Sequence, residues 1–107
     1  MAFQVLEVAQ SMVRQLGPVV RSVSLCDGDL ADQLRRAATS VPLNIAEGNG
    51  RAGRDRAHHF RIASGSAREV RAALEVAEAW GYVVPVATAG ALGDLDRVLA
   101  MLWKLTR

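Results

Sequence analysis

Apolar residues recur every three or four positions along nearly the whole chain, which is the spacing of one face of an α-helix. The first stripe predicts a helix from about Phe3 to about Leu25. Gly17-Pro18 lies inside it, and a proline removes one backbone hydrogen bond of a helix. Because the apolar spacing continues in phase across this pair, we expect one long kinked helix, with two abutting helices as the alternative. The stripe comprises Leu6, Ala9, Val13, Leu16, Val20 and Val23.

A second helix is predicted after the turn Asp27-Gly28-Asp29. Asp29 is the expected N-cap, because an aspartate side chain accepts hydrogen bonds from the free amides of the first turn. Pro42 lies inside this helix and favours a kink near Ala38. Gly48-Asn49-Gly50 is expected to end the helix with residues that tolerate a positive φ. The apolar face comprises Leu30, Leu34, Ala37, Val41 and Ile45.

Two more stripes predict a third helix from about Arg54 to Trp80, ended by Gly81, and a fourth from about Val86 to Thr106. No segment alternates with a period of two, so no strand is predicted. Four helices joined by short turns are typical of an all-α, antiparallel up-down-up-down four-helix bundle. Residues 1–107 are expected to form a single domain. The predicted core face of the third helix comprises Phe60, Ala63, Ala67, Val70, Leu74 and Ala77, and that of the fourth Leu92, Leu95, Val98, Leu99, Leu102 and Leu105.

The third helix carries a second apolar strip, rotated away from its core face. A helix that is apolar on two sides needs two packing partners. We therefore predict that copies of the chain associate, with tryptophans among the anchors because this residue is enriched at such contacts. The alternative is that connectors or neighbouring helices cover the strip. The strip comprises Ile62, Ala73, Val76 and Trp80, and the predicted interface residues are Ile62, Val76, Trp80 and Trp103.

Composition fits a folded protein with a modest core. Of the 107 residues, 50% are hydrophobic and 22% charged, which excludes intrinsic disorder. Cys26 is the single cysteine, so a disulfide scaffold within the chain is excluded. The start lacks the basic region of an export signal, and the longest uncharged run, 79–93, contains Pro85 and three glycines. We therefore expect a cytoplasmic protein without a membrane span.

Residues with catalytic or metal-binding potential are few. Neither His58 nor His59 lies three residues after a glutamate, as the histidines of di-iron bundles do. Cys26 lacks companions for a zinc site and is expected to be a buried or half-buried thiol. The glycine-rich segment 49–54 lacks the lysine and the preceding strand of a nucleotide loop. We therefore expect no enzymatic activity, no metal and no cofactor.

Arginine is the most informative residue type. Thirteen basic and 11 acidic residues give a net charge of only +2, but 12 of the bases are arginines, whose guanidinium suits phosphate contacts. At about 100° per residue, one row of the third helix lies opposite its core face. We predict that this row, with Arg51, contacts phosphates of RNA or DNA. The alternative is a solvated face with ion pairs, such as Arg71 with Glu75. The row, called the arginine stripe below, comprises Arg54, His58, Arg61, Gly65 and Arg68.

The segment 31–51, ADQLRRAATSVPLNIAEGNGR, resembles the signature of the four-helix-bundle protein family also described as 23S ribosomal RNA intervening-sequence proteins. Phe60 to Ala63, Gly65-Ser66 and Glu69 resemble the third helix of that family. Gly17-Pro18, the glycine-rich start of the fourth helix and the pair His58-His59 depart from its pattern. The matching motif residues include Asp32, Gln33, Leu34, Arg35, Arg36, Pro42, Asn44, Glu47, Gly48 and Arg51.

The resemblance implies a bundle whose second helix includes the proline. It also implies assembly into a ring-like homo-oligomer, commonly a pentamer. Some relatives are encoded inside insertions in ribosomal RNA genes, and a related group comprises accessory proteins of diversity-generating retroelements, which bind a reverse transcriptase and nucleic acid. Two function classes follow: a nucleic-acid-binding assembly, and a protein-interaction scaffold or accessory subunit with no direct nucleic-acid role.

Overall fold

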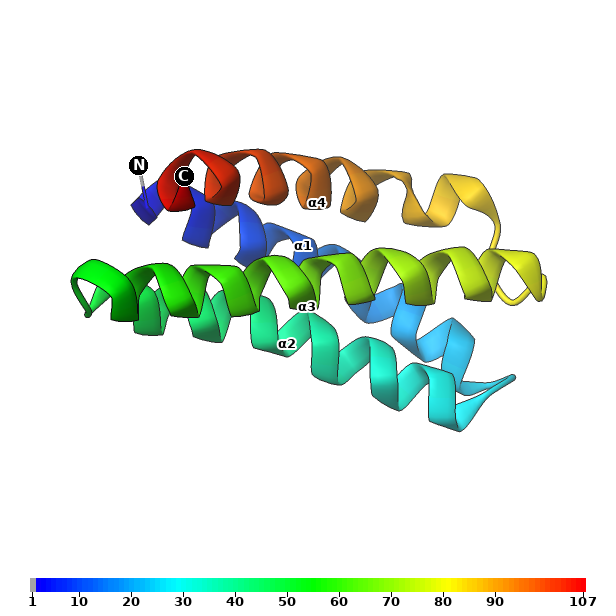
Figure 1. Ribbon diagram of the computed structural model, residues 1–107. Coiled ribbons are helices and arrows are strands. Elements are labelled where there is room, and N and C mark those ends of the chain that lie inside the picture. The colour runs from blue at the N-terminus through cyan, green and yellow to red at the C-terminus, as the bar shows by residue number, and fades with distance from the viewer. Residues whose placement is uncertain (1) are drawn as a thin grey trace.

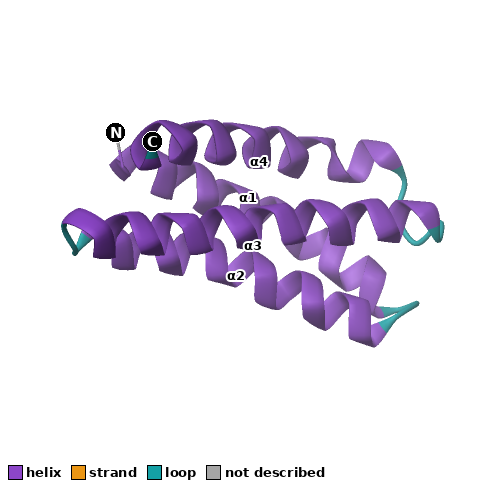
Figure 2. Cartoon of the chain, in the orientation of Figure 1, coloured by secondary structure: helices purple, strands orange, loops and turns teal. Residues whose placement is uncertain are grey.

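The protein is all-α, as the apolar spacing predicts. The computed structural model describes residues 2–107, which form four helices and no strand: α1 (Ala2–Ser24), α2 (Gly28–Asn49), α3 (Gly53–Ala79) and α4 (Pro85–Thr106). Figure 1 shows the four helices side by side, with the two ends of the chain at the same end of the molecule. The connections are short turns, drawn in teal in Figure 2.

The helices enclose one elongated hydrophobic core. Each helix packs against two others, in the pairs α1–α2, α2–α3, α3–α4 and α1–α4. The molecule measures 42 × 22 × 19 Å along its principal axes, so the core is long and narrow. Phe60, Met12 and Leu16 are among its largest side chains, and all are buried. The predicted core face of α3 is buried throughout, which confirms that part of the pattern.

Helix α1 runs without interruption through Pro18, which excludes two abutting helices. Its buried face is rotated from the predicted stripe, because Val5, Met12 and Val19 are buried whereas Val13 is 36% exposed. Apolar residues occur over a wide arc of α1, so a stripe of three-and-four spacing can be drawn through it in more than one phase.

The predicted N-cap of the second helix and the backbone conformation at its end need correction. Asp27, not Asp29, is the N-cap, and its carboxylate accepts a hydrogen bond from the amide of Leu30 at 3.0 Å. At the other end the helix stops at Asn49, within the predicted segment 48–50, but its C-cap Gly50 has a φ of −86°. A positive φ was expected here, but the amide of Gly50 instead bonds to the carbonyl of Glu47 at 3.2 Å, which tightens the last turn.

Two other glycines take the left-handed conformations that the turns require. Gly53 opens α3 with φ +60°, and Gly81 follows α3 with φ +79°. Positive φ is strained for other residues and free for glycine. Gly81 therefore ends the third helix, as predicted, and Gly53 provides the sharp turn from α2.

Candidate nucleic-acid interface

The arginine stripe lies on the solvent side of α3. All five of its residues are exposed, while the opposite face of the helix fills the core. None of its three arginines forms an ion pair with a carboxylate among residues 2–107. These guanidinium groups therefore keep donors for an external anion. The stripe comprises Arg54, His58, Arg61, Gly65 and Arg68.

Arg51, which was grouped with the stripe, lies in a different setting. Its guanidinium contacts the carboxylate of Glu47 at 3.1 Å and that of Asp55 at 2.6 Å. The hydrogen bond and charge of Asp55, and then those of Glu47, raise the pKa of Arg51 above its usual value. Glu47 belongs to α2, Arg51 to the connecting turn and Asp55 to α3, so the two ion pairs clamp the α2–α3 turn. Two carboxylates leave Arg51 poorly suited to bind phosphate.

A hollow of about 500 Å³ lies between the arginine stripe and the end of α4. Arg61 and Arg68 line it from α3, and Trp103 and Arg107 line it from the last part of the chain. Arg61 also donates a hydrogen bond to the carbonyl of Thr106 at 3.3 Å, which ties its side chain to the end of α4. Sequence reasoning missed this arrangement, because it depends on how α3 and α4 align. We call it the α3–α4 hollow.

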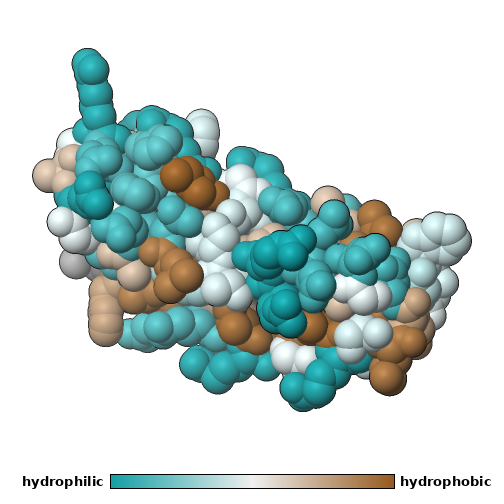
Figure 3. Space-filling model, turned by 90° about the horizontal axis from the view of Figure 1, so that it is seen from below, coloured by the Kyte–Doolittle hydropathy of each residue, from teal (hydrophilic) through white to brown (hydrophobic). Residues whose placement is uncertain are grey.

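The second apolar strip of α3 is largely uncovered. Ile62 is 38% exposed, Val76 43% and Trp80 68%, whereas Ala73 is buried. Connectors and neighbouring helices cover these three side chains only in part, and each remains more than one third exposed. Trp80 stacks on Tyr82, with ring centroids 6.3 Å apart. The face of the molecule seen from below is mostly hydrophilic, and its hydrophobic side chains lie in separate groups (Figure 3).

The structure does not bring the two tryptophans together. Trp80 follows the end of α3, whereas Trp103 lies near residues 61–68 in the first half of that helix. They therefore belong to different surfaces, Trp80 to the apolar strip and Trp103 to the α3–α4 hollow.

A polar seam joins α2 to α3. The Ser66 hydroxyl bonds to that of Ser40 at 2.8 Å, and the Asn44 amide donates to the Ser40 hydroxyl and carbonyl, each at 3.0 Å. Asn44 Oδ1 lies 3.3 Å from Nδ1 of His59. No hydroxyl of the seam contacts the imidazole, so the arrangement is not that of a nucleophile and its base. The seam fixes how the two helices align.

The remaining residues of the sequence motif belong to α2. Leu34 is fully buried, and Asp32 forms an ion pair with Arg35 at 3.1 Å. Gln33 and Arg36 are exposed on α2. Pro42 lies inside α2, which continues through it. The motif thus mostly builds the second helix and its junction with the third.

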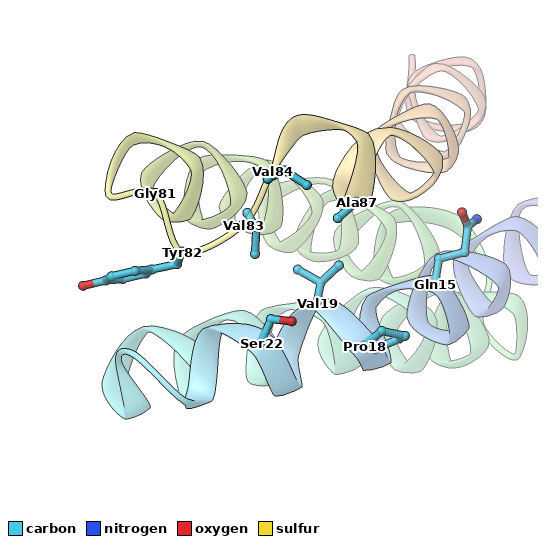
Figure 4. A pocket seen from close by; sticks show the side chains of 9 residues that line it. All are labelled: Gln15, Pro18, Val19, Ser22, Gly81, Tyr82, Val83, Val84 and Ala87. Atoms are coloured by element: carbon cyan, nitrogen blue, oxygen red, sulfur yellow. The ribbon is translucent and has the colours of Figure 1, made fainter.

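A second hollow, of about 460 Å³, lies between α1 and the connector before α4. Val19 and Val83 point toward each other across it, and the ring of Tyr82 points away from it (Figure 4). Burial raises the pKa of Tyr82 above its usual value, and the negative charge of Asp27 adds to the effect. Ser22 contributes a hydroxyl, but the lining contains no carboxylate, imidazole, thiol or amine that could act as its base.

Two expectations about single side chains are wrong. Cys26 is exposed, because α1 ends at Ser24 and the thiol lies in the following turn. Arg71 pairs with Asp96 of α4 rather than with Glu75 of its own helix. Within residues 2–107, no group of three histidine, cysteine or acidic residues is placed to hold a metal ion. None of the described helices combines the length and hydropathy needed to cross a membrane.

Comparison with known protein families finds a match over nearly the whole chain. The sequence model of the family described as 23S rRNA-intervening sequence protein matches residues 2–104. No curated protein matches the sequence.

Proposed function

Because the chain belongs to the 23S rRNA-intervening sequence protein family, we propose that it is a non-enzymatic, homo-oligomeric protein that binds nucleic-acid phosphates. Arg54, Arg61 and Arg68 provide the contacts, with His58 beside them. The observation that carries the proposal is the exposure of these three arginines on one row, without a carboxylate partner among the described residues. A solvated face held by ion pairs would place acidic groups next to them.

Repetition of the stripe supplies the affinity that one chain lacks. A net charge of +2 gives a single chain a weak field. In an assembly each copy adds another stripe, and several weak phosphate contacts to one strand act together. Binding of this kind depends strongly on salt and little on base sequence, because phosphate contacts release counterions without reading bases.

The apolar strip supports the self-association in this proposal. Ile62, Val76 and Trp80 are exposed on α3, and a second copy would remove them from water. The resemblance of the motif adds a ring, commonly of five copies, and the short turns between the four helices favour antiparallel order. That order is supported by two cross-helix contacts, since Arg61 bonds to Thr106 whereas Arg71, further along α3, pairs with Asp96, earlier in α4.

The same strip favours a second candidate function. An exposed apolar row that ends in a tryptophan also fits another protein, and the chain would then be a scaffold or accessory subunit, for example of a reverse transcriptase. Such a protein needs no row of free arginines. The arginine stripe therefore favours nucleic-acid binding over a purely protein-binding role.

The test is fluorescence anisotropy of labelled single-stranded RNA and DNA at about 50 mM salt, where phosphate contacts are strong. Wild type is compared with Arg54→Ala/Arg61→Ala and with Arg14→Ala/Arg21→Ala, which removes the same charge from exposed positions on α1. We expect the stripe variant to lose most of the binding and the α1 variant to keep it. Absence of wild-type binding, or equal losses in both variants, would refute the role of the stripe and leave the scaffold function. Light scattering on the same samples measures self-association.

A further inference from the structure

We propose that the α3–α4 hollow binds an unpaired nucleotide of a single-stranded nucleic acid, with its base stacked on Trp103 and its flanking phosphates held by Arg61 and Arg68. This inference rests on the proposed function and specifies it, because it selects unpaired strands over duplexes. The arginine stripe alone makes no such distinction, since phosphates occur in both.

Trp103 provides the aromatic surface. Its side chain is 63% exposed, although it lines a hollow and belongs to the last turns of a helix whose other face is in the core. Leaving a large indole in water forgoes the stabilisation that its burial would give. A nucleobase that stacks on this ring would recover that stabilisation, and every base has a face suited to stacking.

The charges around the ring fit a polyanion. The residues that line the hollow include Arg61, Arg68 and Arg107 but no aspartate or glutamate. Arg61 uses one of its five N–H donors on the Thr106 carbonyl, and the others remain available. The volume of about 500 Å³ lies in the range of small-ligand sites, so one nucleotide unit enters without displacing protein.

An unpaired strand suits this combination better than a duplex. Bases inside a duplex are stacked on their neighbours, whereas an unpaired base can be turned onto an aromatic side chain. Proteins that bind single strands without sequence preference combine a positively charged groove with such rings. Trp80 lacks this setting, because it already stacks on Tyr82 and lies in the apolar strip.

The two tryptophans provide a matched pair of variants, since Trp80 is 68% and Trp103 63% exposed. The probes are an oligothymidylate and an oligouridylate of about 12 nucleotides, within the site sizes of such proteins. An abasic strand of equal length keeps the phosphates without the bases, and a duplex of equal length keeps the bases paired. Anisotropy gives the affinities of wild type, Trp103→Ala, Trp103→Phe and Trp80→Ala. Quenching of Trp103 fluorescence in Trp80→Phe reports stacking without a mutation in the hollow.

We expect both unpaired probes to bind wild type at least about fivefold more tightly than the abasic strand or the duplex, from the stacking of one base. Trp103→Ala removes this preference, and Trp103→Phe restores much of it. Trp80→Ala retains the preference for unpaired strands, although weaker self-association lowers its affinity for every probe. Equal affinity for unpaired and abasic strands, or no quenching of Trp103, overturns the inference while leaving phosphate binding intact. Failure of every probe to bind refutes the proposed function as well. If Trp103→Ala lowers the mass of the assembly, Trp103 is an interface residue and the inference falls.

Discussion

The ring of Phe60 lies directly against the α-carbon of Gly48, so that a β-carbon added to the glycine would be only 2.6 Å from Cε1 of the ring. Gly48 belongs to α2 and Phe60 to α3, and both are buried. The missing side chain thus lets a large core ring approach the backbone of the neighbouring helix. This contact gives the glycine of the sequence motif a packing role.

Gly48→Ala is expected to destabilise the fold by about 1–3 kcal/mol, because a well-packed core must shift to admit a methyl group. Gly65→Ala is the matched control, since Gly65 also lies inside a helix but nothing lies within 4 Å of its added β-carbon. There the change is expected to stabilise by about 0.4–1 kcal/mol. Urea unfolding followed by circular dichroism measures both. Equal effects of the two substitutions would contradict the packing role of Gly48.

Asp27→Ala is expected to cost about 1 kcal/mol of stability, because it removes the side-chain acceptor of the α2 N-cap. Asp29→Ala tests the neighbouring aspartate, which lies in the first turn and interacts only with the helix dipole. Its cost is expected to be about 0.3–1 kcal/mol and to shrink with added salt. Thermal unfolding at low and high salt separates the two contributions. A larger loss of stability for Asp29→Ala than for Asp27→Ala would indicate that Asp29 is the N-cap, as the local sequence pattern predicted.

Asn44→Ala is expected to destabilise by about 1–3 kcal/mol, because it removes hydrogen bonds to Ser40 and His59 in a half-buried seam and leaves their polar atoms unpaired. Thr39→Ala serves as the control, since the Thr39 hydroxyl bonds only to the carbonyl of Arg35 on an exposed surface. Denaturant midpoints compare the two variants. A loss for Asn44→Ala no greater than for Thr39→Ala would show that the seam adds no stability.

Tyr82 is the single tyrosine of the chain, so absorbance at the phenolate band reports it alone. Burial and then the charge of Asp27 raise its pKa, and the titration midpoint is therefore expected above the ordinary value of about 10. Because the folded state disfavours the phenolate, the associated stability is present below pH 10 and declines as pH rises further. Asp27→Asn keeps a capping side chain, removes the charge and is expected to lower the midpoint. An unchanged midpoint in that variant would exclude the electrostatic contribution of Asp27.

The sequence pattern predicted the helices well where one face is buried and the other is exposed to solvent. The core face of α3 from Phe60 to Ala77 is the clearest case. In α1 the stripe was less accurate, because apolar residues occur over a wide arc of that helix and Val5 and Met12 are buried outside the predicted row. Two aspartates flank Gly28, and local sequence alone does not determine which of them caps α2.

Hydrophobic periodicity did not predict which residues of different helices contact each other. The pairing of Arg71 with Asp96 and the position of Trp103 beside Arg61 depend on how α3 and α4 align. The exposure of the arginine stripe, by contrast, followed from the helical wheel, because the row lies opposite the core face. The ion pairs of Arg51 with Glu47 and Asp55 depend on the shape of the α2–α3 turn, so periodicity did not separate Arg51 from the stripe.

The salt dependence of nucleic-acid binding tests the central claim most directly. The logarithm of the affinity for a single strand is expected to fall linearly with the logarithm of salt concentration, by about 0.7 for each phosphate neutralised. In Arg54→Ala/Arg68→Ala, the slope should become shallower by about 0.7 for every removed arginine that contacts the probe. Arg14→Ala/Arg21→Ala, on α1, should leave the slope unchanged. A slope that is the same in wild type and in the stripe variant would contradict the account.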